Sequence, residues 1–367
     1  MKILHLPTST GGNSWGLSQA ERRLGHTSQV LIADSNPYKY KADIEIPFPT
    51  QLVGRNEPLS KSEIQYKLHK IRTFMKIRSR YDVFHFNFGR TLFDFPSLGI
   101  EHLELPFYSN KSKIVVTYNG CDARQKDWTI NHRSISPCHH DNCYGGWCND
   151  VSRDIQKRKR IAKFAKYAKH FFALNPDLLH FLPEEKSSFM PYTIHNQGLI
   201  DNNKNNPVDK DKITIVHAPT EPVAKGTPYL LKAIESLKEK HNNSFDFILI
   251  QNMPHEEAMR MYQKADLIID QLLAGWYGAF AIEAMSMGKA VASFIREEDL
   301  VYIPDKMADD LKNSMINVSI DNIESNIEYF IEDPDSLKSY MKNGHKYANN
   351  WHDPIKIARE ALTYYQT

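Results

Sequence analysis

The sequence predicts an α/β protein made of two doubly wound, parallel-sheet domains in tandem. Short apolar runs rich in β-branched residues alternate with helical patterns in both halves of the chain. The polar, asparagine-rich segment 201–212 separates the two alternations, and 367 residues are more than one ordinary core needs. We therefore expect one domain at 1–195, a second at 196–352, and a C-terminal helix at 353–367 that can cross back to the first domain.

The elements of the first domain follow from its apolar runs and the turn residues between them. A helix over 15–24 should end at Gly25, with Asn13 or Ser14 as its N-cap. The long stretch 121–150 has little periodicity, and connections of that length usually have a function of their own. Strands are expected at 2–6, 29–32, 83–88, 114–118 and 171–174.

The second domain repeats this alternation and continues into helices from residue 320 onwards, the last of them over 354–365. Two such domains bring the carboxyl ends of two sheets face to face across a cleft, where open α/β sheets bind ligands. Strands are expected at 213–216, 245–250, 267–269 and 290–293, and helices at 228–238, 256–262 and 280–287.

A small-residue turn followed by a helix and a buried strand predicts an anion site in the second domain. The first N–H groups of a helix and its dipole point out of the N-terminus, so a phosphate can lie there without a metal. The candidate contacts are Gly278, Ala279 and Phe280. Glu283, one turn further on, can reach the hydroxyls of a sugar attached to that phosphate. An ordinary buried helix that ends at Gly288 is the alternative.

Bulk composition narrows the classes of protein. The 46 basic and 44 acidic residues leave a formal charge of +2, so no nucleic-acid partner is demanded. The longest apolar runs are too short to span a bilayer, and the N-terminal run ends at Pro7, too soon for a signal peptide. We expect a cytoplasmic protein. Four cysteines without an export signal favour reduced thiols or a metal site over disulfides.

Four short segments occur in an order and spacing that point to one enzyme class. They are Gly11-Gly12-Asn13, Thr117-Tyr118-Asn119-Gly120-Cys121-Asp122, Lys225-Gly226-Thr227 and the run from Gly275 to Glu283. With them the chain resembles, over nearly its whole length, the GT-B glycosyltransferases and more closely glycosyltransferase family four. The resemblance implies two Rossmann-like domains, a nucleoside-diphosphate sugar as donor, a carbohydrate or lipid-linked acceptor, and retention of anomeric configuration.

The resemblance assigns roles to the matched residues. Breaking a glycosyl–phosphate bond develops charge on the leaving diphosphate, which Lys225 and the helix start at Gly278 can neutralise without a catalytic metal. Gly226 and Glu283 complete the donor site, and Glu283 accepts from the ribose hydroxyls. The loop Gly11-Gly12-Asn13 lets the backbone approach the donor closely. The alternatives are a solvated turn lysine, a helix-surface glutamate and a tight turn.

Three departures from the family pattern affect the site. Gly275 stands where the family has a glutamate that meets the donor, and the usual arginine is absent from 217–225. Asn119 replaces a histidine and can bind a sugar hydroxyl, but it cannot transfer a proton. Asp122 and Arg124 can hold a sugar or pair with each other. The expected catalytic residues are thus Lys225, Asn119 and Asp122.

Two other features have both a functional and a structural interpretation. Cys121, Cys138, Cys143 and Cys148 can hold a structural zinc ion, with His139 or His140 as substitutes, or they are thiols in a long loop. The basic helix 157–172 can contact an anionic membrane surface with its lysines, or it covers a sheet with the apolar stripe that contains Ile161 and Phe164.

The leading hypothesis is a glycosyltransferase that moves a hexose or hexosamine to a surface-polysaccharide or glycoconjugate acceptor. A nucleotide-sugar epimerase or hydrolase of the same fold is the nearest alternative. A different class is a zinc-bearing, basic nucleic-acid-binding protein, which would leave the second domain without a role. A metal-dependent GT-A transferase would use Asp209 and Asp211, but this pair lies in the polar linker.

Overall fold

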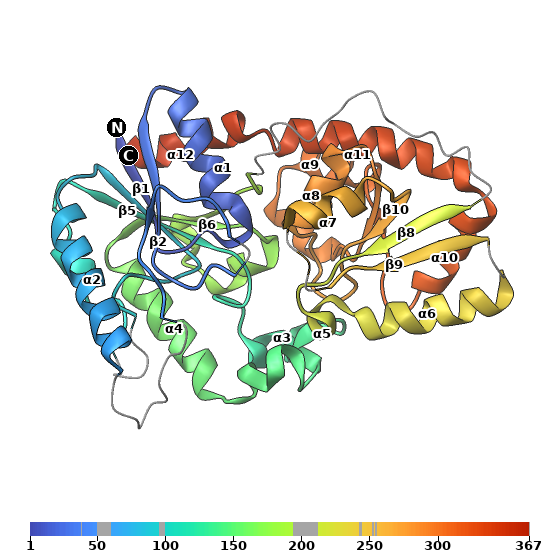
Figure 1. Cartoon of the computed structure of the whole chain (residues 1–367), viewed down its shortest axis with the longest axis horizontal. Coiled ribbons are helices and arrows are strands. Elements are labelled where there is room, and N and C mark those ends of the chain that lie inside the picture. Colours follow the sequence, from blue (N-terminus) through green and yellow to red (C-terminus); the bar gives the residue numbers. More distant parts are fainter. Residues whose placement is uncertain are drawn as a thin grey trace. The chain divides into compact units, whose positions relative to one another are not determined.

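The computed structural model describes residues 1–37, 39–49, 60–94, 100–193, 212–241, 244–251, 253 and 255–366. The chain forms two compact units (Figure 1). Unit 1 comprises Met1–Gln125, Ile155–His195 and Pro354–Thr367, and unit 2 comprises Lys126–Asp154 and Asn196–Asp353. The stretch 126–154 thus groups with unit 2. The asparagine-rich linker up to residue 211, with Asp209 and Asp211, lies outside the described residues.

The described part of unit 1 contains a seven-stranded parallel sheet in the order β3-β2-β1-β4-β5-β6-β7. Its strands are β1 (Lys2–Leu6), β2 (Thr27–Ile32), β3 (Ile44–Glu45), β4 (Val83–Asn87), β5 (Lys113–Tyr118), β6 (Ala168–Ala173) and β7 (Ser187–Phe189). Its helices are α1 (Asn13–Arg23), α2 (Lys61–Ile77), α4 (Ser152–Ala165) and α12 (Pro354–Gln366).

Side-chain alternation along the strands of unit 1 gives the sheet two buried faces. Leu4 and Phe84 point to the face that α2 and α4 cover, and Phe74 and Phe164 fill the space between helices and sheet. Ile3 belongs to the other face, which α1 and α12 cover. Because a strand reverses its side chains at every residue, β1 serves both cores.

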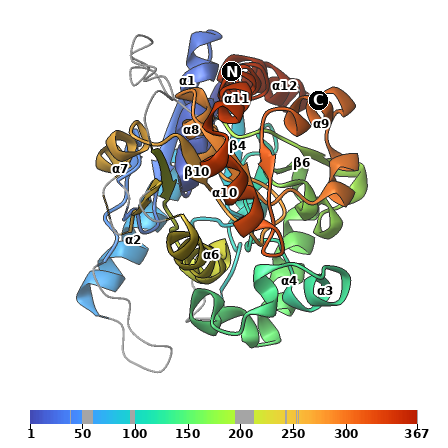
Figure 2. The same cartoon turned by 90° about the vertical axis from the view of Figure 1, so that its right-hand side faces the viewer.

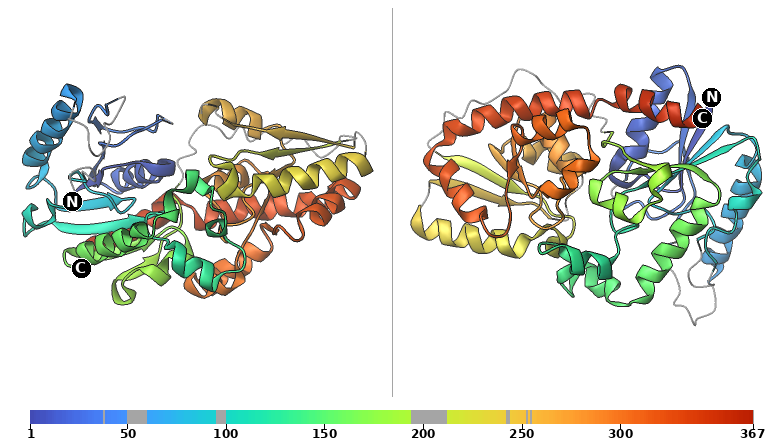
Figure 3. Two further views of the ribbon diagram at one scale, coloured as in Figure 1. Left: turned by 90° about the horizontal axis from the view of Figure 1, so that it is seen from below. Right: turned by 180° about the vertical axis from the view of Figure 1, so that it is seen from behind.

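The C-terminal helix α12 is part of unit 1, where it lies beside α1 (Figures 1 and 3). The buried Tyr365 hydroxyl lies 2.6 Å from Nδ1 of His85, whose Nε2 lies 2.6 Å from Oγ1 of Thr117. Burial holds the pKa of His85 well below its ordinary value. His85 is therefore a hydrogen-bonded core residue that ties α12 to strands β4 and β5.

The described part of unit 2 contains a five-stranded parallel sheet in the order β12-β11-β10-β8-β9. Its strands are β8 (Ile213–His217), β9 (Phe245–Leu249), β10 (Leu267–Ile269), β11 (Ala290–Ser293) and β12 (Ile316–Asn317). Its helices are α3 (Lys126–His132), α5 (Pro222–Lys225), α6 (Thr227–Lys240), α7 (His255–Tyr262), α8 (Ala279–Ser286), α9 (Asp305–Lys312), α10 (Ile323–Glu332) and α11 (Leu337–Trp351).

Helices α6 and α10 lie side by side and share one core with the sheet of unit 2 (Figure 2). Leu230 and Leu237, two turns apart on α6, meet Ile327 of α10 and Ile215 of the interior strand β8 in this core. Helix α11 contacts both α8 and β11. Apolar residues spaced three and four apart lie on one side of a helix, which explains why α6 and α10 each bury an apolar stripe.

Two details of the expected elements are wrong. Helix α1 is capped by Gly12 in the left-handed region, without a side-chain cap from Asn13 or Ser14. The basic helix ends at Ala165, so Phe172 belongs to β6 rather than to the apolar stripe of the helix. The cap thus lies one residue before Asn13, and the helix ends seven residues before Phe172.

Replacing Tyr365 with phenylalanine should destabilise unit 1. The change removes the hydroxyl that meets the buried His85 ring and leaves Nδ1 without that partner. An unsatisfied buried polar atom costs about 1–3 kcal/mol. Urea denaturation should show this loss for Tyr365→Phe and no change for Tyr329→Phe, whose side chain is exposed. Equal stability of the two variants would contradict the role of the hydroxyl.

Candidate functional site

The candidate site of unit 2 lies at the carboxyl ends of β8 and β10, which are neighbours in the sheet. From β8 the chain first moves to β9 on one side and then to β10 on the other. The loops that follow β8 and β10 therefore diverge, and this is where open α/β sheets bind ligands. Three segments meet here: the loop that contains Lys225, the end of β10 and the start of α8.

Lys225 is fixed by its backbone. It ends the short helix α5, which begins with the Glu221 carboxylate accepting the Ala224 N–H. Gly226 follows with φ +78°, and a Cβ there would come within 2.9 Å of the Cβ of Leu272. The Lys225 carbonyl accepts the Leu272 N–H at 3.0 Å. The lysine backbone is thus held against the loop that follows β10, and only glycine fits the next position.

The Lys225 ammonium lies beside the buried carboxylate of Asp270, the first residue after β10. Oδ1 of Asp270 is 2.7 Å from Nζ of Lys225, and Oδ2 accepts the Gly278 N–H at 2.6 Å. The carboxylate is fully buried, whereas 17% of the lysine side chain is exposed. A Cβ on Gly278 would lie 3.4 Å from Nζ, so the ammonium is next to the start of α8.

The start of α8 offers two backbone donors instead of the expected three. Gly278 is the N-cap, has no side chain to cap the helix, and already donates its N–H to Asp270. The N–H groups of Ala279 and Phe280 have no acceptor within the part of the chain that the structure describes. Gly278, Ala279, Phe280 and Glu283 are all partly exposed. An anion can therefore reach the two amides beside Lys225.

His217, the last residue of β8, is a structural residue at this edge. Its Nδ1 donates to the Ile269 carbonyl at 2.8 Å, because a carbonyl can only accept. Nε2 then accepts from the Thr227 hydroxyl at 2.8 Å. Burial, assisted by the charge of Lys225, lowers the pKa of His217 to about 4. A neutral ring thus joins β8, β10 and α6 near pH 7.

Gly275, at the position where the resembled family has a glutamate, has a guanidinium packed against it. Its φ is +81°, and a Cβ would lie 2.3 Å from Nη1 of Arg296. The same guanidinium pairs with the buried Asp299 at 3.2 Å and donates to the Ile135 carbonyl at 2.7 Å. A side chain at 275 would therefore have to displace Arg296.

A pocket of about 450 Å³ adjoins Arg296 within unit 2. Arg133 pairs there with Asp299 at 2.6 Å and with the exposed Glu298 at 2.9 Å. Two guanidinium groups thus share one buried carboxylate. The lining residues are Ile130, Asn131, His132, Arg133, Ser134, Ile135, Phe294, Arg296 and Glu298.

The glycine-rich loop of unit 1 follows β1 and has two residues in the left-handed region. Gly11 has φ +63° and Gly12 has φ +71°, conformations that favour glycine, and both are partly exposed. Asn13 is buried. Its Oδ1 accepts the Thr193 N–H at 2.7 Å, and its carbonyl accepts the Thr193 hydroxyl at 2.7 Å. The Asn13 side chain thus holds the start of α1 to Thr193, whereas the two glycines stay partly exposed.

Asp122 and Arg124 do not pair with each other. The Asp122 carboxylate accepts the N–H groups of Asn119, at 3.0 Å, and of Gly120, at 2.6 Å. Removal from water raises its pKa to about 6, against the lowering effect of these bonds. Arg124 forms a buried bidentate pair with Asp177 at 2.6 and 3.0 Å. Both side chains therefore hold the turn after β5.

Asn119 retains an unused acceptor. Its Oδ1 is buried and meets no hydrogen-bond donor among the described residues. Its carbonyl accepts from Nδ2 of Asn175 at 3.0 Å, which fixes the backbone. An orphaned buried oxygen in a strand-end turn is a rare feature that a ligand hydroxyl would satisfy.

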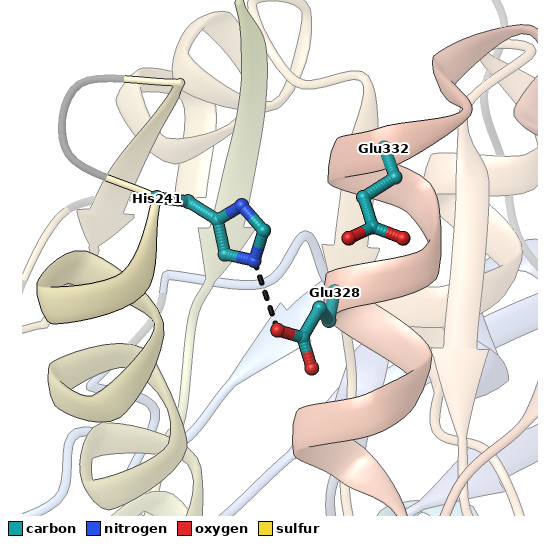
Figure 4. A group of neighbouring side chains, drawn as sticks. All are labelled: His241, Glu328 and Glu332. Atoms are coloured by element: carbon teal, nitrogen blue, oxygen red, sulfur yellow. Dashed lines mark hydrogen bonds and ion pairs between the residues drawn. The ribbon is translucent and has the colours of Figure 1, made fainter.

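The cysteines and the acidic clusters bear on metal binding. In the described part of the chain, one group of His, Cys, Asp or Glu side chains has three ligand atoms within 4.8 Å of one another: His241, Glu328 and Glu332 (Figure 4). His241 lies 2.9 Å from Glu328, within hydrogen-bond distance, and Lys240 forms an ion pair with the same carboxylate at 3.5 Å, so both residues join α6 to α10.

The cysteines are all half-buried. Cys138, Cys143 and Cys148 belong to unit 2, and Cys121 belongs to unit 1. Among the residues that the structure describes, none of the four is part of such a three-ligand group. The zinc site stays a prediction.

The basic helix α4 uses much of its charge inside unit 1. Lys157 is buried and donates to the Arg124 carbonyl at 2.7 Å. Lys163 and Arg160 both reach Glu101, at its carbonyl and its carboxylate respectively. The membrane contact stays a prediction. None of the helices that the structure describes combines the length and apolar character needed to cross a bilayer.

Two charged residues at the site of unit 2 were not expected from the sequence. Asp270 directly follows a buried strand, and an acidic residue in that place is a signal of a charged group at the edge of the sheet. Arg296 occupies the space beside Gly275, and a glycine in place of a charged residue was the only hint.

Comparison with solved structures identifies the fold. Sucrose-phosphate synthase from Thermosynechococcus elongatus matches with a TM-score of 0.62 and 14% identity over 100% of this chain and 98% of that chain. HepE from Anabaena, solved with UDP-glucose, matches with a TM-score of 0.58 and 13% identity over 100% of both chains. The UDP-GlcNAc 2-epimerase from Neisseria meningitidis, solved with UDP-GlcNAc, matches with a TM-score of 0.53 and 14% identity over 99% of this chain and 100% of that chain.

These likenesses show that the two Rossmann-like units have the GT-B fold, as the sequence predicted. At identities this low they carry the fold and nothing finer. No protein-family model matches the sequence, and no curated protein matches it by sequence.

Gly275→Ala should destabilise unit 2 by more than the strain of its backbone alone. The left-handed conformation costs about 1–2 kcal/mol for a residue with a Cβ, and the Arg296 guanidinium must also move. Gly145→Ala is the matched control, because Gly145 has φ +63° and nothing within 4 Å of a Cβ. Urea denaturation should show the larger loss for Gly275→Ala, and equal losses would contradict the packing of Arg296.

Asp122→Asn should change how stability depends on pH. The folded-state pKa of Asp122, about 6, exceeds the ordinary 3.8, so the folded protein binds the proton more tightly. The stability of the wild type should therefore fall relative to Asp122→Asn as the pH rises from about 4 to about 6, by on the order of 1–2 kcal/mol. Urea titrations at several pH values measure this difference, and parallel curves would contradict the raised pKa.

Proposed function

We propose that the protein is a glycosyltransferase that moves a hexose or hexosamine from a nucleoside-diphosphate sugar to a carbohydrate or lipid-linked acceptor, with retention of configuration. The acceptor class that fits the resemblance is a surface polysaccharide or glycoconjugate. Proton NMR of the product's anomeric signal tests retention.

One observation carries this proposal: the Lys225 ammonium lies at the start of α8, beside two backbone N–H groups without acceptors among the described residues. Ammonium and amides are the donors that a leaving diphosphate needs, because they absorb charge as the glycosyl–phosphate bond breaks. Their place at the carboxyl ends of β8 and β10 is where this fold binds ligands. The diphosphate would lie against Ala279 and Phe280, with Glu283 one turn away for the ribose.

In the proposed chemistry the leaving group is neutralised without a metal ion. A fixed ammonium and a helix N-terminus both act electrostatically, and both are worth most where water is partly excluded. In unit 1, the buried Oδ1 of Asn119 is the proposed acceptor for a sugar hydroxyl. The partly exposed Gly11 and Gly12 are the proposed point of close approach to the donor.

The structural neighbours favour uridine diphosphate as the first donor nucleotide to test. HepE was solved with UDP-glucose, and a Staphylococcus aureus protein, MnaA, that matches with a TM-score of 0.54 was solved with UDP. The second candidate function is epimerisation or hydrolysis of a nucleotide sugar, which the UDP-GlcNAc 2-epimerase neighbour favours. Incubating UDP-sugars with and without acceptors while following free UDP separates the three reactions. Only transfer requires the acceptor, hydrolysis releases UDP without it, and epimerisation yields an isomeric UDP-sugar with no net release of UDP.

Lys225→Ala should weaken UDP binding and lower turnover more than it harms folding, although it takes the ammonium away from the buried Asp270 carboxylate, which keeps the Gly278 amide as a partner. Saturating UDP should raise the melting temperature of the wild type, since a ligand at 100 times its Kd stabilises by about 2.7 kcal/mol. The variant should lose most of this shift, whereas Lys312→Ala, at an exposed position, should keep it. A thermal-shift panel of uridine, guanosine, adenosine and thymidine diphosphates makes the measurement. No shift with any of them would refute the proposed donor class.

A further inference from the structure

We propose that Asp270 is a positioning residue that fixes the Lys225 ammonium at the start of α8 and raises turnover at the expense of diphosphate affinity. This inference rests on the proposed function and assigns a role to a residue outside the matched motifs. It comes from one arrangement: a fully buried carboxylate that holds the ammonium with one oxygen and the Gly278 amide with the other.

Asp270 is itself rigidly placed. Its N–H donates to the Ala292 carbonyl at 2.9 Å, which ties its backbone to β11. The Gly278 amide fixes one carboxylate oxygen, so the other points to Lys225 from a fixed position. The lysine is then held at both ends, at its carbonyl by the Leu272 N–H and at Nζ by Asp270. A long, flexible side chain is thereby ordered before any ligand arrives.

The negative charge of Asp270 explains why this arrangement lowers the affinity for a diphosphate. The Asp270 carboxylate offsets the positive charge of Lys225, so a diphosphate is attracted less than by a bare lysine. The extra charge on the departing diphosphate develops only while the bond breaks. An ammonium that is already in place then stabilises this charge without having to reorganise. Interactions that strengthen in the transition state raise kcat, whereas weak ground-state binding raises only Kd.

Asp270→Asn separates these two effects. Asparagine has nearly the same shape, can still accept one hydrogen bond and carries no charge. UDP should bind several-fold more tightly, because a buried negative charge near it is gone. At the same time kcat should fall by about tenfold or more, because the ammonium loses its anchor.

The matched control is Asp266→Asn at the other end of the same strand. Asp266 is also buried, and its carboxylate accepts the Thr214 N–H at 2.8 Å. This variant should leave both UDP affinity and kcat within about twofold of the wild type. If Asp270→Asn keeps the wild-type kcat, or loses UDP affinity together with kcat, the positioning role is overturned.

Two further measurements keep the test decisive. If Asp270→Asn does not fold, Asp270→Glu retains the charge but displaces the ammonium, so kcat should fall without any gain in affinity. Unchanged kcat in that variant overturns the proposal as well.

The anchoring of Lys225 has a readout independent of activity, which matters if the wild type neither binds nor uses a UDP-sugar. Acylation by an N-hydroxysuccinimide ester, followed by peptide mass spectrometry, reports how accessible Nζ is. Lys225 should react faster in Asp270→Asn than in the wild type or Asp266→Asn, with Lys312 unchanged. Equal rates overturn the anchoring, whereas a wild type inert towards every nucleotide overturns only the proposed function.

Discussion

The arrangement at the carboxyl edge of unit 2 depends on the need of one buried carboxylate for partners. A buried charge is stable only when it is paired and hydrogen-bonded, and Asp270 finds an ammonium and an amide. These partners come from the loop after β8 and from the start of α8, so the single requirement brings three segments to one point. Backbone contacts alone could not hold the Lys225 ammonium there, because four methylene groups separate it from the main chain.

The sequence predicted the parts of this site that have local patterns. Central strands such as β8 and β10 are short runs of β-branched and apolar residues, and the start of α8 follows a glycine. The pairing of Lys225 with Asp270 joins residues 45 apart, and no periodicity reports which strand ends are neighbours. The sequence therefore predicted one free amide too many at the start of α8. The Gly278 N–H is taken by the Asp270 carboxylate, which comes from another segment of the chain.

Short elements and competing partners limited the predictions for unit 1. Strand β3 has two residues, too few for an alternation to be visible. Asp122 and Arg124 are close in sequence and carry opposite charges, yet a short aspartate reaches the amides of its own turn, and the long arginine reaches Asp177. Side-chain length decided these partners, whereas the charge pattern left both pairings open.

Gly275, where the resembled family has a glutamate, belongs to a set of contacts that depend on one another. Because Arg296 fills the space beside Gly275 and is balanced by the buried Asp299, a glutamate could not be restored without removing the guanidinium and leaving that carboxylate with one partner fewer. The glycine, the arginine and the aspartate thus form one coupled set. Where the resembled family has a carboxylate, this chain has a glycine with the cationic Arg296 packed beside it, and Asp299 balances that charge. A substitution at any one of these three positions would therefore disturb the packing or the charge pairing of the other two.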